Sequence, residues 1–484
     1  MKVIERFLAT AQDYASKVAL WDSDRPYTYA DLRRAVDVRA HHILISTSRQ
    51  NVGLLLPTGA EFVVSYFGAL LANKTPVPVS AYLSPHELVH VVEDAHLDCI
   101  LSTGDLASQL DETEASVVLV EKLEPSPTKL RPVDVASAAP HAGLLYTAGS
   151  EGKPKGVPLS DLNLLANLAG CRRAIDFNDR FVILGTLPLF HSLALTTTVL
   201  LPLLWGATAV YVGKFDPLRV LSAIERRRVT AVVSIPSLYR ILLARTADVA
   251  LPDISTLTYA ISGGEPLGEA LRTAFADRFG VDLLNGYGLT EASPVVSVNT
   301  LKENRPGSVG KPLHNVRVRI VDPDTNDALP PGVPGEIRVE GLSIMEGYHN
   351  RPDLTRERFT PDRFFRTGDV GMLDRDGFLH VTGRRSEMMI VSGENVFPQE
   401  IEEAIARHEA VLEVAVTGVL DETRGEVPKA FVVLAPGKTA SEEEIRQWCR
   451  GILHPSKVPR SVEFRPQLPR GPTGKVLRRE LKSA

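Results

Sequence analysis

The stretch PLRVLSAIERRRVTAVVSIP (residues 217–236) sets a helical pattern directly before a strand pattern. Apolar residues recur at helical spacing in its first half, and its second half is a short, β-branched run that suits one buried strand. The same alternation recurs along the chain, with short apolar runs at 51–57, 75–80 and 257–264 and another helical pattern at 269–280. Strands that alternate with helices favour layered α/β structure with largely parallel sheets.

The later part of the chain has a different pattern. Residues 316–341 predict two strands joined by a Pro- and Gly-rich turn, which indicates an antiparallel β section. Beyond it, helical patterns at 398–409 and 441–453 alternate with strand patterns, as in a small α+β domain. We therefore expect an α/β fold with a large N-terminal domain, residues 1–386, and a small C-terminal domain, residues 387–484.

Composition limits the classes of function. A length of 484 residues is too great for one core, and the net charge of -5 offers no reason to expect a nucleic-acid partner. Cys99, Cys171 and Cys449 are far apart, which disfavours a disulfide framework or a zinc site and fits a reducing compartment. The first residues carry charges throughout and lack an apolar signal core, so we expect a cytoplasmic protein.

Residues 181–212 contain no charged side chain, and a run of this length can indicate a membrane span. Gly185, Pro188, Pro202 and Gly206 interrupt the run, however. Because such residues break a spanning helix, we predict two buried strands flanking a buried helix and no integral membrane span.

The loop YTAGSEGKPKGV (residues 146–157) has the composition of a phosphate-binding loop. Its glycines let backbone N–H groups converge, and its hydroxyl and ammonium groups can contact phosphate oxygens. It is not a Walker A loop, because no lysine followed by Ser or Thr stands at the required spacing. Glu151 should repel phosphate, and a solvated turn is the alternative interpretation. The candidate contacts are Thr147, Ser150, Gly152 and Lys155.

Three further motifs follow: NGYGLTEASP (285–294), RTGDVGMLDRDGFLHVTGRRSEMMIVSGENVFPQEIE (366–402) and PRGPTGKVLRREL (469–481). Together with the loop at 147–156, they make the chain resemble the adenylate-forming superfamily of acyl-CoA synthetases, luciferases and peptide-synthetase adenylation domains. The loop departs from the superfamily pattern at Ala148 and Glu151. The resemblance covers nearly the whole chain, and several motifs in the family's order form a more specific pattern than one loop.

The resemblance implies a reaction with two halves. A carboxylate attacks the α-phosphate of ATP to give an acyl adenylate and pyrophosphate, with Mg²⁺ as cofactor. A thiol of CoA or of an acyl carrier protein then attacks the adenylate, and AMP leaves. The partners implied are therefore a small carboxylic acid, ATP, and CoA or a carrier protein.

Four residues are implied to act in catalysis. By similarity, Lys475 reaches the carboxylate and phosphate oxygens, Thr290 bonds a phosphate oxygen, and Glu291 holds Mg²⁺, which prefers carboxylate ligands. His191, in PLFHSLAL, is implied to lie between the acyl and thiol channels. The alternatives are a surface lysine, a Thr-Glu helix cap and a core histidine.

Other residues are implied to bind the nucleotide. Tyr287 would lie against adenine, while Asp369 and Arg384 would contact the ribose; core packing, a turn acid and a structural salt bridge are the respective alternatives. Glycines beside the nucleotide would permit close approach. The remaining members of this implied set are Gly263, Gly264, Glu265, Asn285, Gly286 and Gly288.

The superfamily turns its C-terminal domain between the two half-reactions, so the small domain is implied to be mobile. Glu387 occupies the position of the pivot, where Asp or Lys is usual, and a linker acid is the alternative. Ser392 and Gly393 would then line a tunnel for the thiol.

The implied acyl site near His191 and residues 293–298 has small or apolar residues and no evident group to bind an amine or a second carboxylate. This favours a fatty acid as the substrate. The loop pattern and the LPLFHS segment are most similar to fatty acyl ligases related to acyl–acyl carrier protein synthetases. An aromatic-acid–CoA ligase on the same fold and a non-catalytic nucleotide-binding module are the alternatives.

Overall fold

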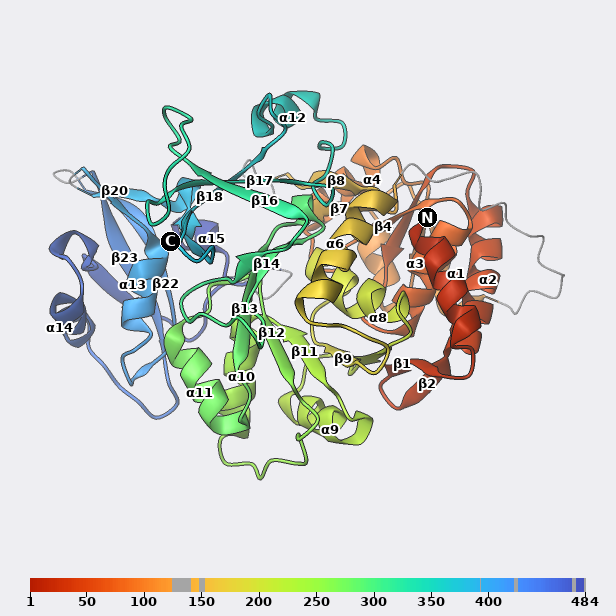
Figure 1. Ribbon diagram of the computed structural model, residues 1–484, viewed down its shortest axis with the longest axis horizontal. Coiled ribbons are helices and arrows are strands. Elements are labelled where there is room, and N and C mark those ends of the chain that lie inside the picture. The colour runs from red at the N-terminus through yellow and green to blue at the C-terminus, as the bar shows by residue number, and fades with distance from the viewer. Residues whose placement is uncertain (124–140, 148–152, 392, 422–424, 472–475, 483–484) are drawn as a thin grey trace.

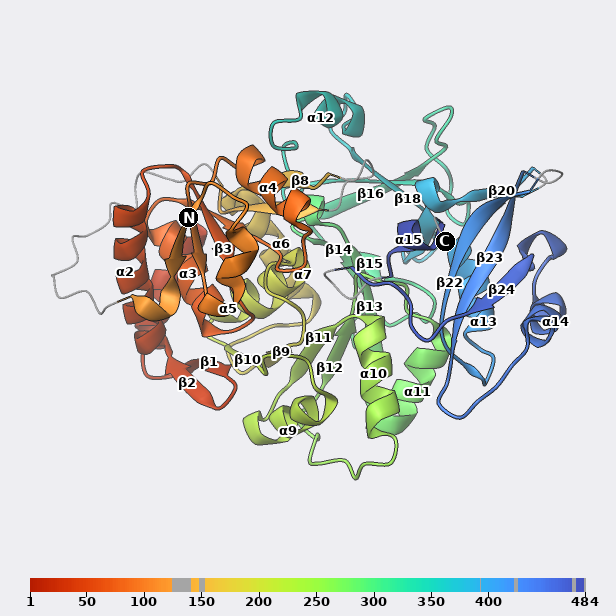
Figure 2. The same ribbon diagram turned by 180° about the vertical axis from the view of Figure 1, so that it is seen from behind.

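The computed structural model of the chain describes residues 1–123, 141–147, 153–391, 393–421, 425–471 and 476–482. The C-terminal elements, blue in Figure 1, lie against one end of a central part, and the N-terminal elements lie at the other end. Figure 2 shows the same arrangement from behind. Six residues singled out in the sequence lie outside the described residues: Ala148, Ser150, Glu151, Gly152, Ser392 and Lys475.

The centre of the molecule is a nine-stranded sheet of order β15-β14-β13-β12-β11-β9-β10-β1-β2. The strands from β13 to β1 run parallel, and β2, β14 and β15 pair antiparallel at the edges. The predicted largely parallel sheet is therefore confirmed. The strands are β1 (Val18–Asp22), β2 (Arg25–Thr28), β9 (Val182–Gly185), β10 (Thr208–Tyr211), β11 (Ala231–Ser234), β12 (Tyr259–Ser262), β13 (Leu283–Gly288), β14 (Val295–Val298) and β15 (Lys311–Pro312).

Both faces of this sheet are buried, and alternate residues of a strand serve opposite faces. In β11, Val232 packs into one apolar core, whereas Ala231 and Val233 pack into the core on the other face. This period of two is expected of a strand covered on both sides. The first core includes α9 (Pro217–Arg227), α10 (Pro236–Thr246) and α11 (Glu269–Phe279), and the second includes α6 (Asp161–Ala174).

The uncharged run at 181–212 forms β9, a helical stretch and β10, which confirms the predicted pair of buried strands around a buried helix. The helical stretch contains α7 (Ser192–Ala194), a π-helical segment (Leu195–Leu200) and α8 (Leu201–Leu203). Over the residues that the structure describes, no helix combines the length and the apolar character needed to cross a membrane.

The N-terminal part contains a four-stranded parallel sheet of order β4-β3-β5-β6 and the hairpin β7–β8. The glycine-rich loop connects the two strands of this hairpin. The strands are β3 (Asn51–Leu55), β4 (Thr75–Pro78), β5 (Cys99–Ser102), β6 (Ser116–Leu119), β7 (Gly143–Thr147) and β8 (Lys155–Leu159), and the helices are α1 (Val3–Asp13), α2 (Tyr29–Ser46), α3 (Ala60–Leu71), α4 (Pro85–Asp94) and α5 (Gly104–Ala107).

A four-stranded antiparallel sheet of order β16-β17-β18-β19 follows the central sheet and confirms the predicted β section. Helix α12 (Pro352–Arg358) lies between its second and third strands in the sequence. The strands are β16 (Val316–Val321), β17 (Gly335–Gly341), β18 (Phe365–Leu373) and β19 (Leu379–Arg384).

The C-terminal elements form a sheet of order β21-β20-β23-β22, with β24 paired to β23. One face packs in a core with α13 and α14, and residues from the other face pack with Leu481 of α15. Ser441 caps α14, because its hydroxyl accepts a hydrogen bond from the Glu444 amide. The elements are β20 (Met389–Val391), β21 (Glu394–Val396), α13 (Pro398–Ile405), β22 (Val411–Asp421), β23 (Gly425–Leu434), α14 (Glu442–Ile452), β24 (Ser461–Phe464) and α15 (Arg478–Lys482).

Candidate active site

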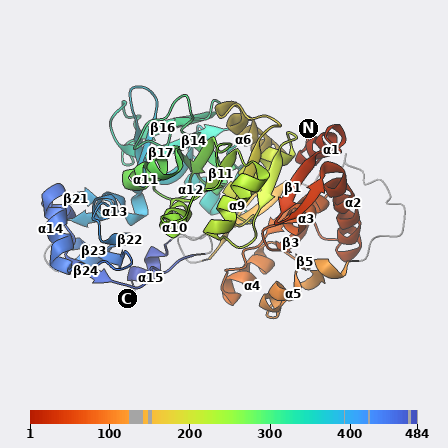
Figure 3. The ribbon, with the colours of Figure 1, turned by 90° about the horizontal axis from the view of Figure 1, so that it is seen from below.

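A cavity of about 910 Å³ opens beside the carboxyl ends of β11, β12 and β13. Its lining combines residues after β12 and β13 with C-terminal residues 470–471 and 476–478. Figure 3, seen from below, shows the C-terminal part alongside the central sheet and its helices. Ligands of α/β proteins bind in the crevice outside the carboxyl ends of parallel strands. This cavity is therefore the candidate active site.

Thr290 and Glu291 form a short turn after β13, and both line the cavity. The Tyr348 hydroxyl donates a 2.7 Å hydrogen bond to the Glu291 carboxylate, and the hydroxyls of Thr290 and Ser192 lie 3.0 Å apart. The Lys155 ammonium lies 5.7 Å from the centre of the Tyr348 ring. Burial, together with Glu291, raises the pKa of Tyr348, so this hydroxyl stays protonated and acts as a donor.

Asp369 of β18 is buried next to the cavity and connects two of its lining residues. One carboxylate oxygen accepts a 2.5 Å hydrogen bond from the Tyr287 hydroxyl, and the other lies 3.2 Å from Arg384 Nε. Attraction to Asp369 raises the pKa of Arg384. Because a carboxylate offers about four lone-pair positions, Asp369 can hold both partners and still accept further hydrogen bonds.

Four predicted glycines bring backbone to the cavity: Gly263 and Gly264 after β12, and Gly286 and Gly288 in β13. Gly264 has a φ of +81°, a conformation that other residues rarely adopt. A Cβ atom on Gly288 would lie 2.2 Å from the Pro294 carbonyl oxygen. These two positions therefore require glycine, which keeps this side of the cavity open to a flat ligand.

His191 lines the cavity at the start of α7, as Thr147 does at the end of β7. The Leu193 amide donates a 3.3 Å hydrogen bond to His191 Nδ1, which places the proton of a neutral ring on Nε2. The neighbouring Phe190 meets the ring of Tyr82 edge to face, with ring centres 6.3 Å apart. A neutral His191 ring can therefore donate a hydrogen bond through Nε2.

The C-terminal motif reaches the cavity on both sides of its lysine. Gly471 and Val476 line the cavity, and Lys475, which stands between them in the sequence, is outside the described residues. Arg478 also lines the cavity and forms a 2.9 Å ion pair with Glu387, the predicted pivot. The pivot residue is thus tied to the segment that carries the lysine.

Some predicted site residues do not line the cavity. Glu265 accepts hydrogen bonds of 3.0 Å from both the amide and the hydroxyl of Ser237, so its carboxylate caps the start of α10. Asn285 donates a 3.4 Å hydrogen bond to the Ser308 carbonyl. Gly393 is exposed between β20 and β21, and beyond its chain neighbours no described atom lies within 4 Å of the place that a Cβ atom would take. A nucleotide role for the first two side chains and a thiol-tunnel role for Gly393 stay predictions.

The other end of the cavity extends back along the sheet beneath α6. The residues that line this part are Cys171, Ile175, Ile183 of β9, and Ala231 and Val233 of β11. Ser234 of β11 pairs with Ser262 of β12, so Ala231 lies four residues behind the level of Gly263, or about 13 Å at 3.3 Å per residue.

Sequence reasoning missed several residues of this site. Tyr348 lies in a turn between β17 and α12 and belongs to none of the motifs, so no local pattern pointed to its contact with Glu291. Ser192 stands next to His191 in PLFHSLAL, but only His191 was singled out there. Arg470 and Arg478 lie within the C-terminal motif, and their positive charges were a usable signal for a place beside an anionic ligand.

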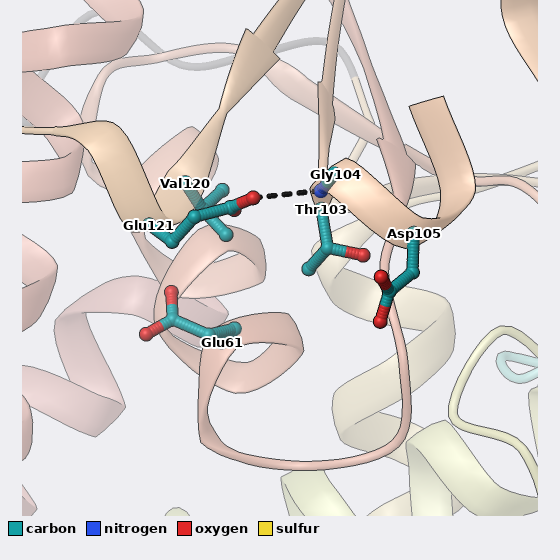
Figure 4. Close-up of a pocket in the computed structure, with 6 residues that line it drawn as sticks. All are labelled: Glu61, Thr103, Gly104, Asp105, Val120 and Glu121. Carbon is teal, nitrogen blue, oxygen red and sulfur yellow. Dashed lines mark hydrogen bonds between the residues drawn. The ribbon is translucent and has the colours of Figure 1, made fainter. Parts of the chain in front are cut away.

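A second hollow of about 260 Å³ lies in the N-terminal part (Figure 4). Its lining includes the carboxyl groups of Glu61, Asp105 and Glu121, and Glu121 accepts a 2.7 Å hydrogen bond from the Gly104 amide. No cation belongs to the lining that the structure describes. Because acidic groups repel phosphates and carboxylates, this hollow does not suit the substrates implied by the motifs.

Comparison with known proteins agrees with the geometry. A family model described as AMP-binding enzyme matches residues 7–349, and one described as AMP-binding enzyme C-terminal domain matches residues 400–475. A long-chain-fatty-acid–CoA ligase of Bacillus subtilis is 32% identical over 475 residues, covering 89% of this chain and 84% of the relative. A feruloyl-CoA synthase of an Amycolatopsis species is 35% identical, covering 94% of this chain and 93% of the relative.

Solved structures show the same relationship. The o-succinylbenzoate-CoA synthetase of Bacillus subtilis, in complex with its acyl-adenylate intermediate, has a TM-score of 0.89 and 28% identity, covering 99% of this chain and 98% of that one. A second structure of that enzyme, with ATP and a magnesium ion, has a TM-score of 0.88, 28% identity and 98% coverage of both chains. The chain therefore belongs to the AMP-binding enzyme family, within the adenylate-forming superfamily that its motifs resemble.

Proposed function

We propose that this protein is an ATP- and Mg²⁺-dependent fatty acid–CoA ligase that works through an acyl adenylate. Family membership and relatives named as acid–CoA ligases support the reaction class. The observation that carries the choice of acid is the shape of the cavity. Residues suited to a nucleotide gather at the strand ends, and an uncharged apolar pocket continues from them beneath α6.

The nucleotide is proposed to lie at the strand ends. The ring of Tyr287 and the backbone of Gly263 and Gly264 suit the flat adenine, because aromatic and unsubstituted backbone surfaces allow stacking. Asp369 and Arg384 suit the ribose, since they supply an acceptor and a donor next to Tyr287. The Thr290 hydroxyl can donate to the α-phosphate from the turn that follows β13.

The residues at Glu291 fit Mg²⁺. One Glu291 oxygen accepts the Tyr348 hydrogen bond, which leaves the second for a cation. Among the described residues, no group of three or more His, Cys, Asp or Glu side chains could form a complete metal cage. A single carboxylate with phosphate and water ligands is the usual environment of Mg²⁺ at a nucleotide. When bound, Mg²⁺ would neutralise phosphate charge.

In the first half-reaction, a carboxylate oxygen attacks the α-phosphorus, the bond to the bridging oxygen breaks, and pyrophosphate leaves with that oxygen. Lys475 is proposed to stabilise the charge that develops on the oxygens. Both Gly471 and Val476 line the cavity, which supports this assignment. In the second half-reaction, a thiolate attacks the adenylate carbonyl carbon, and AMP leaves with the mixed-anhydride oxygen.

We place the domain boundary at Glu387, with residues 1–386 and 387–484 as the two domains. Rotation there would replace the Lys475 segment at the cavity by Ser392 and Gly393, which would line the thiol tunnel. The present position of Gly393, away from the cavity, and of Arg478, at the cavity, suits the first half-reaction.

A fatty acid suits the deep end of the cavity better than a charged or amino acid does. The residues described there are aliphatic or small, and no charged lining residue belongs to α6, β9 or β11. A buried charge without a partner would be costly, so the substrate tail is uncharged. A hydroxylated aromatic acid is the second candidate, because the feruloyl-CoA synthase is a relative.

The test is direct. The enzyme is incubated with ATP, Mg²⁺, acids from benzoate and ferulate to C16, and either CoA or a holo carrier protein, and the thioesters are identified by mass. We expect an aliphatic acid to give the highest kcat/KM, with CoA as acceptor. A preference for ferulate would establish the aromatic alternative, and a carrier-protein thioester alone would reassign the acceptor. ATP binding without any thioester would indicate a non-catalytic module.

A cytoplasmic location stays part of the proposal. Its support is that Cys99, Cys171 and Cys449 are all buried as free thiols, as expected in a reducing compartment.

A further inference from the structure

Arg358 is a half-buried cation without an acidic partner, and it lies close to the Glu291–Tyr348 pair. It is the last residue of α12, and its Nε atom is buried without a hydrogen-bond partner. Within the described ranges, no carboxylate lies within ion-pair distance of its guanidinium. Burying a charge without a partner costs free energy, so such a group usually has a ligand or a counter-ion in the working protein.

The position of Arg358 is defined by its neighbours. A Cβ atom on Gly368 would lie 3.3 Å from Arg358 Nη1, so the guanidinium lies beside β18 at the residue that precedes Asp369. Helix α12 is also attached to the segment before it, because the Tyr348 amide donates a 2.9 Å hydrogen bond to the Thr355 hydroxyl. The charge of Arg358 acts on the Tyr348 hydroxyl and lowers its pKa against the larger effect of burial.

One lysine and two arginines act on the Tyr348 side chain. Lys155 lies over one face of its ring, and both Arg358 and Arg384 act electrostatically on its hydroxyl. Glu291 is the acid bonded to that hydroxyl. Arg384 already has a counter-charge in Asp369, 3.2 Å away, whereas Arg358 has none among the described residues. An anion that reaches Tyr348 from the nucleotide site would therefore meet uncompensated positive charge.

A helix-end role does not account for Arg358. A cation in the last turn of a helix is favoured by the helix dipole, and Arg356 meets that requirement at the surface. Arg356 has a side chain that is 75% exposed and is paired with Asp353. Arg358 differs because its Nε atom is buried and its guanidinium lies beside Gly368 of β18.

We propose that Arg358 binds the pyrophosphate portion of ATP, that is, the β- and γ-phosphates and the pyrophosphate released from them. The inference rests on the proposed function, since it takes the AMP portion to lie at Tyr287 and Asp369. A guanidinium can donate two parallel hydrogen bonds to phosphate oxygens, and its charge stabilises the leaving pyrophosphate when the bond to the α-phosphorus breaks. AMP lacks these phosphates and does not need Arg358.

The experiment separates the two portions of the nucleotide. Arg358→Met keeps much of the aliphatic side chain and removes the charge, and Arg356→Met is the matched control on the same helix. Calorimetry without the acid substrate measures the affinities for Mg²⁺·ATP, Mg²⁺·pyrophosphate and AMP. Synthetic acyl adenylate with CoA measures the second half-reaction, which involves no pyrophosphate. Melting temperatures show whether each variant is folded.

For Arg358→Met we expect Mg²⁺·ATP and Mg²⁺·pyrophosphate affinities to fall about 10- to 100-fold, the range for a lost charge-assisted contact. The AMP affinity of Arg358→Met and its rate in the second half-reaction should equal those of the native enzyme. Arg356→Met should give native values in every measurement. Unchanged pyrophosphate affinity, or an equal loss for AMP, would overturn the proposal. If Arg358→Met does not fold, Arg358→Lys decides: it should retain part of the pyrophosphate affinity and all of the AMP affinity.

The two proposals fail differently. If the native protein binds ATP and pyrophosphate but makes no thioester, the ligase function is contradicted. The pyrophosphate affinity of Arg358→Met then still decides the role of Arg358. Native ligase activity with pyrophosphate affinity independent of Arg358 contradicts only the role of Arg358.

Discussion

The contact between Tyr348 and Glu291 gives the sharpest prediction for the metal. Tyr348→Phe removes one hydroxyl from a ring that is 8% exposed, and with it the 2.7 Å hydrogen bond to the Glu291 carboxylate. A hydrogen bond to a charged group contributes roughly 1.5–3 kcal/mol. If that bond orients Glu291 toward Mg²⁺, its loss should lower kcat/KM for ATP by about 10- to 150-fold, at 1.36 kcal/mol per tenfold.

The assay is acid-dependent pyrophosphate release over a Mg²⁺ titration. Tyr348→Phe should need more Mg²⁺ for half-maximal rate, because a carboxylate that is no longer held in place binds the cation less well. Tyr66→Phe is the control, since its buried hydroxyl donates a 2.8 Å hydrogen bond to the Ala142 carbonyl away from the cavity. This control should melt at a lower temperature with an unchanged Mg²⁺ requirement. If Tyr348→Phe behaves in the same way, its bond to Glu291 serves stability alone.

Three further predictions concern the nucleotide, the lysine and the acyl tail. Asp369→Asn keeps the shape of the side chain but leaves Arg384 without its counter-charge. Calorimetry should therefore show affinities for ATP and for AMP that are lower by about tenfold or more. Native affinity for both nucleotides would exclude a nucleotide role for Asp369. Lys475→Ala should slow adenylate formation, measured as pyrophosphate release, by roughly 10²- to 10³-fold. The rate of thioester formation from synthetic adenylate should equal that of the native enzyme. Equal losses in both steps would contradict the assignment of Lys475 to the first half-reaction. Ala231→Phe should shift the preferred acid to a shorter chain in a mass-resolved competition, and an unchanged preference in a folded variant would place the tail elsewhere.

Much of the fold could be predicted because its signals are local. The helical and strand patterns at 217–236 became α9 and β11, and the turn-rich stretch at 316–341 became an antiparallel pair. The order of strands could not be predicted in this way. β9 lies between β10 and β11, so its neighbours are set by packing between segments that lie far apart in the sequence.

In the candidate site, too, residues within one motif could be predicted, whereas their partners from distant segments could not. Thr290, Glu291 and Tyr287 stand in one motif, and the structure places all three on the cavity. The partners of these residues come from elsewhere: Tyr348 from the turn before α12, and Asp369 from β18. A motif identifies groups that are adjacent in sequence, whereas hydrogen-bond partners 50 or more residues away, such as Tyr348 at a separation of 57, become visible only when the chain is folded. The side chain of Glu265 shows the reverse case, because its place in a motif suggested a ligand contact and its hydrogen bonds cap α10.

The charges around Tyr348 also bear on the acid in the phosphate loop. Glu151 lies outside the described residues, so its position relative to phosphate stays a prediction. In a Walker A loop, one short segment supplies most of the contacts to the phosphates, and an acid within it would be costly. Here Lys155 of the loop is joined near Tyr348 and Glu291 by Arg358 of α12 and Arg384 of β19. Because the two arginines stand on elements outside the loop, the loop does not have to neutralise ATP by itself, and a glutamate in it is compatible with nucleotide binding.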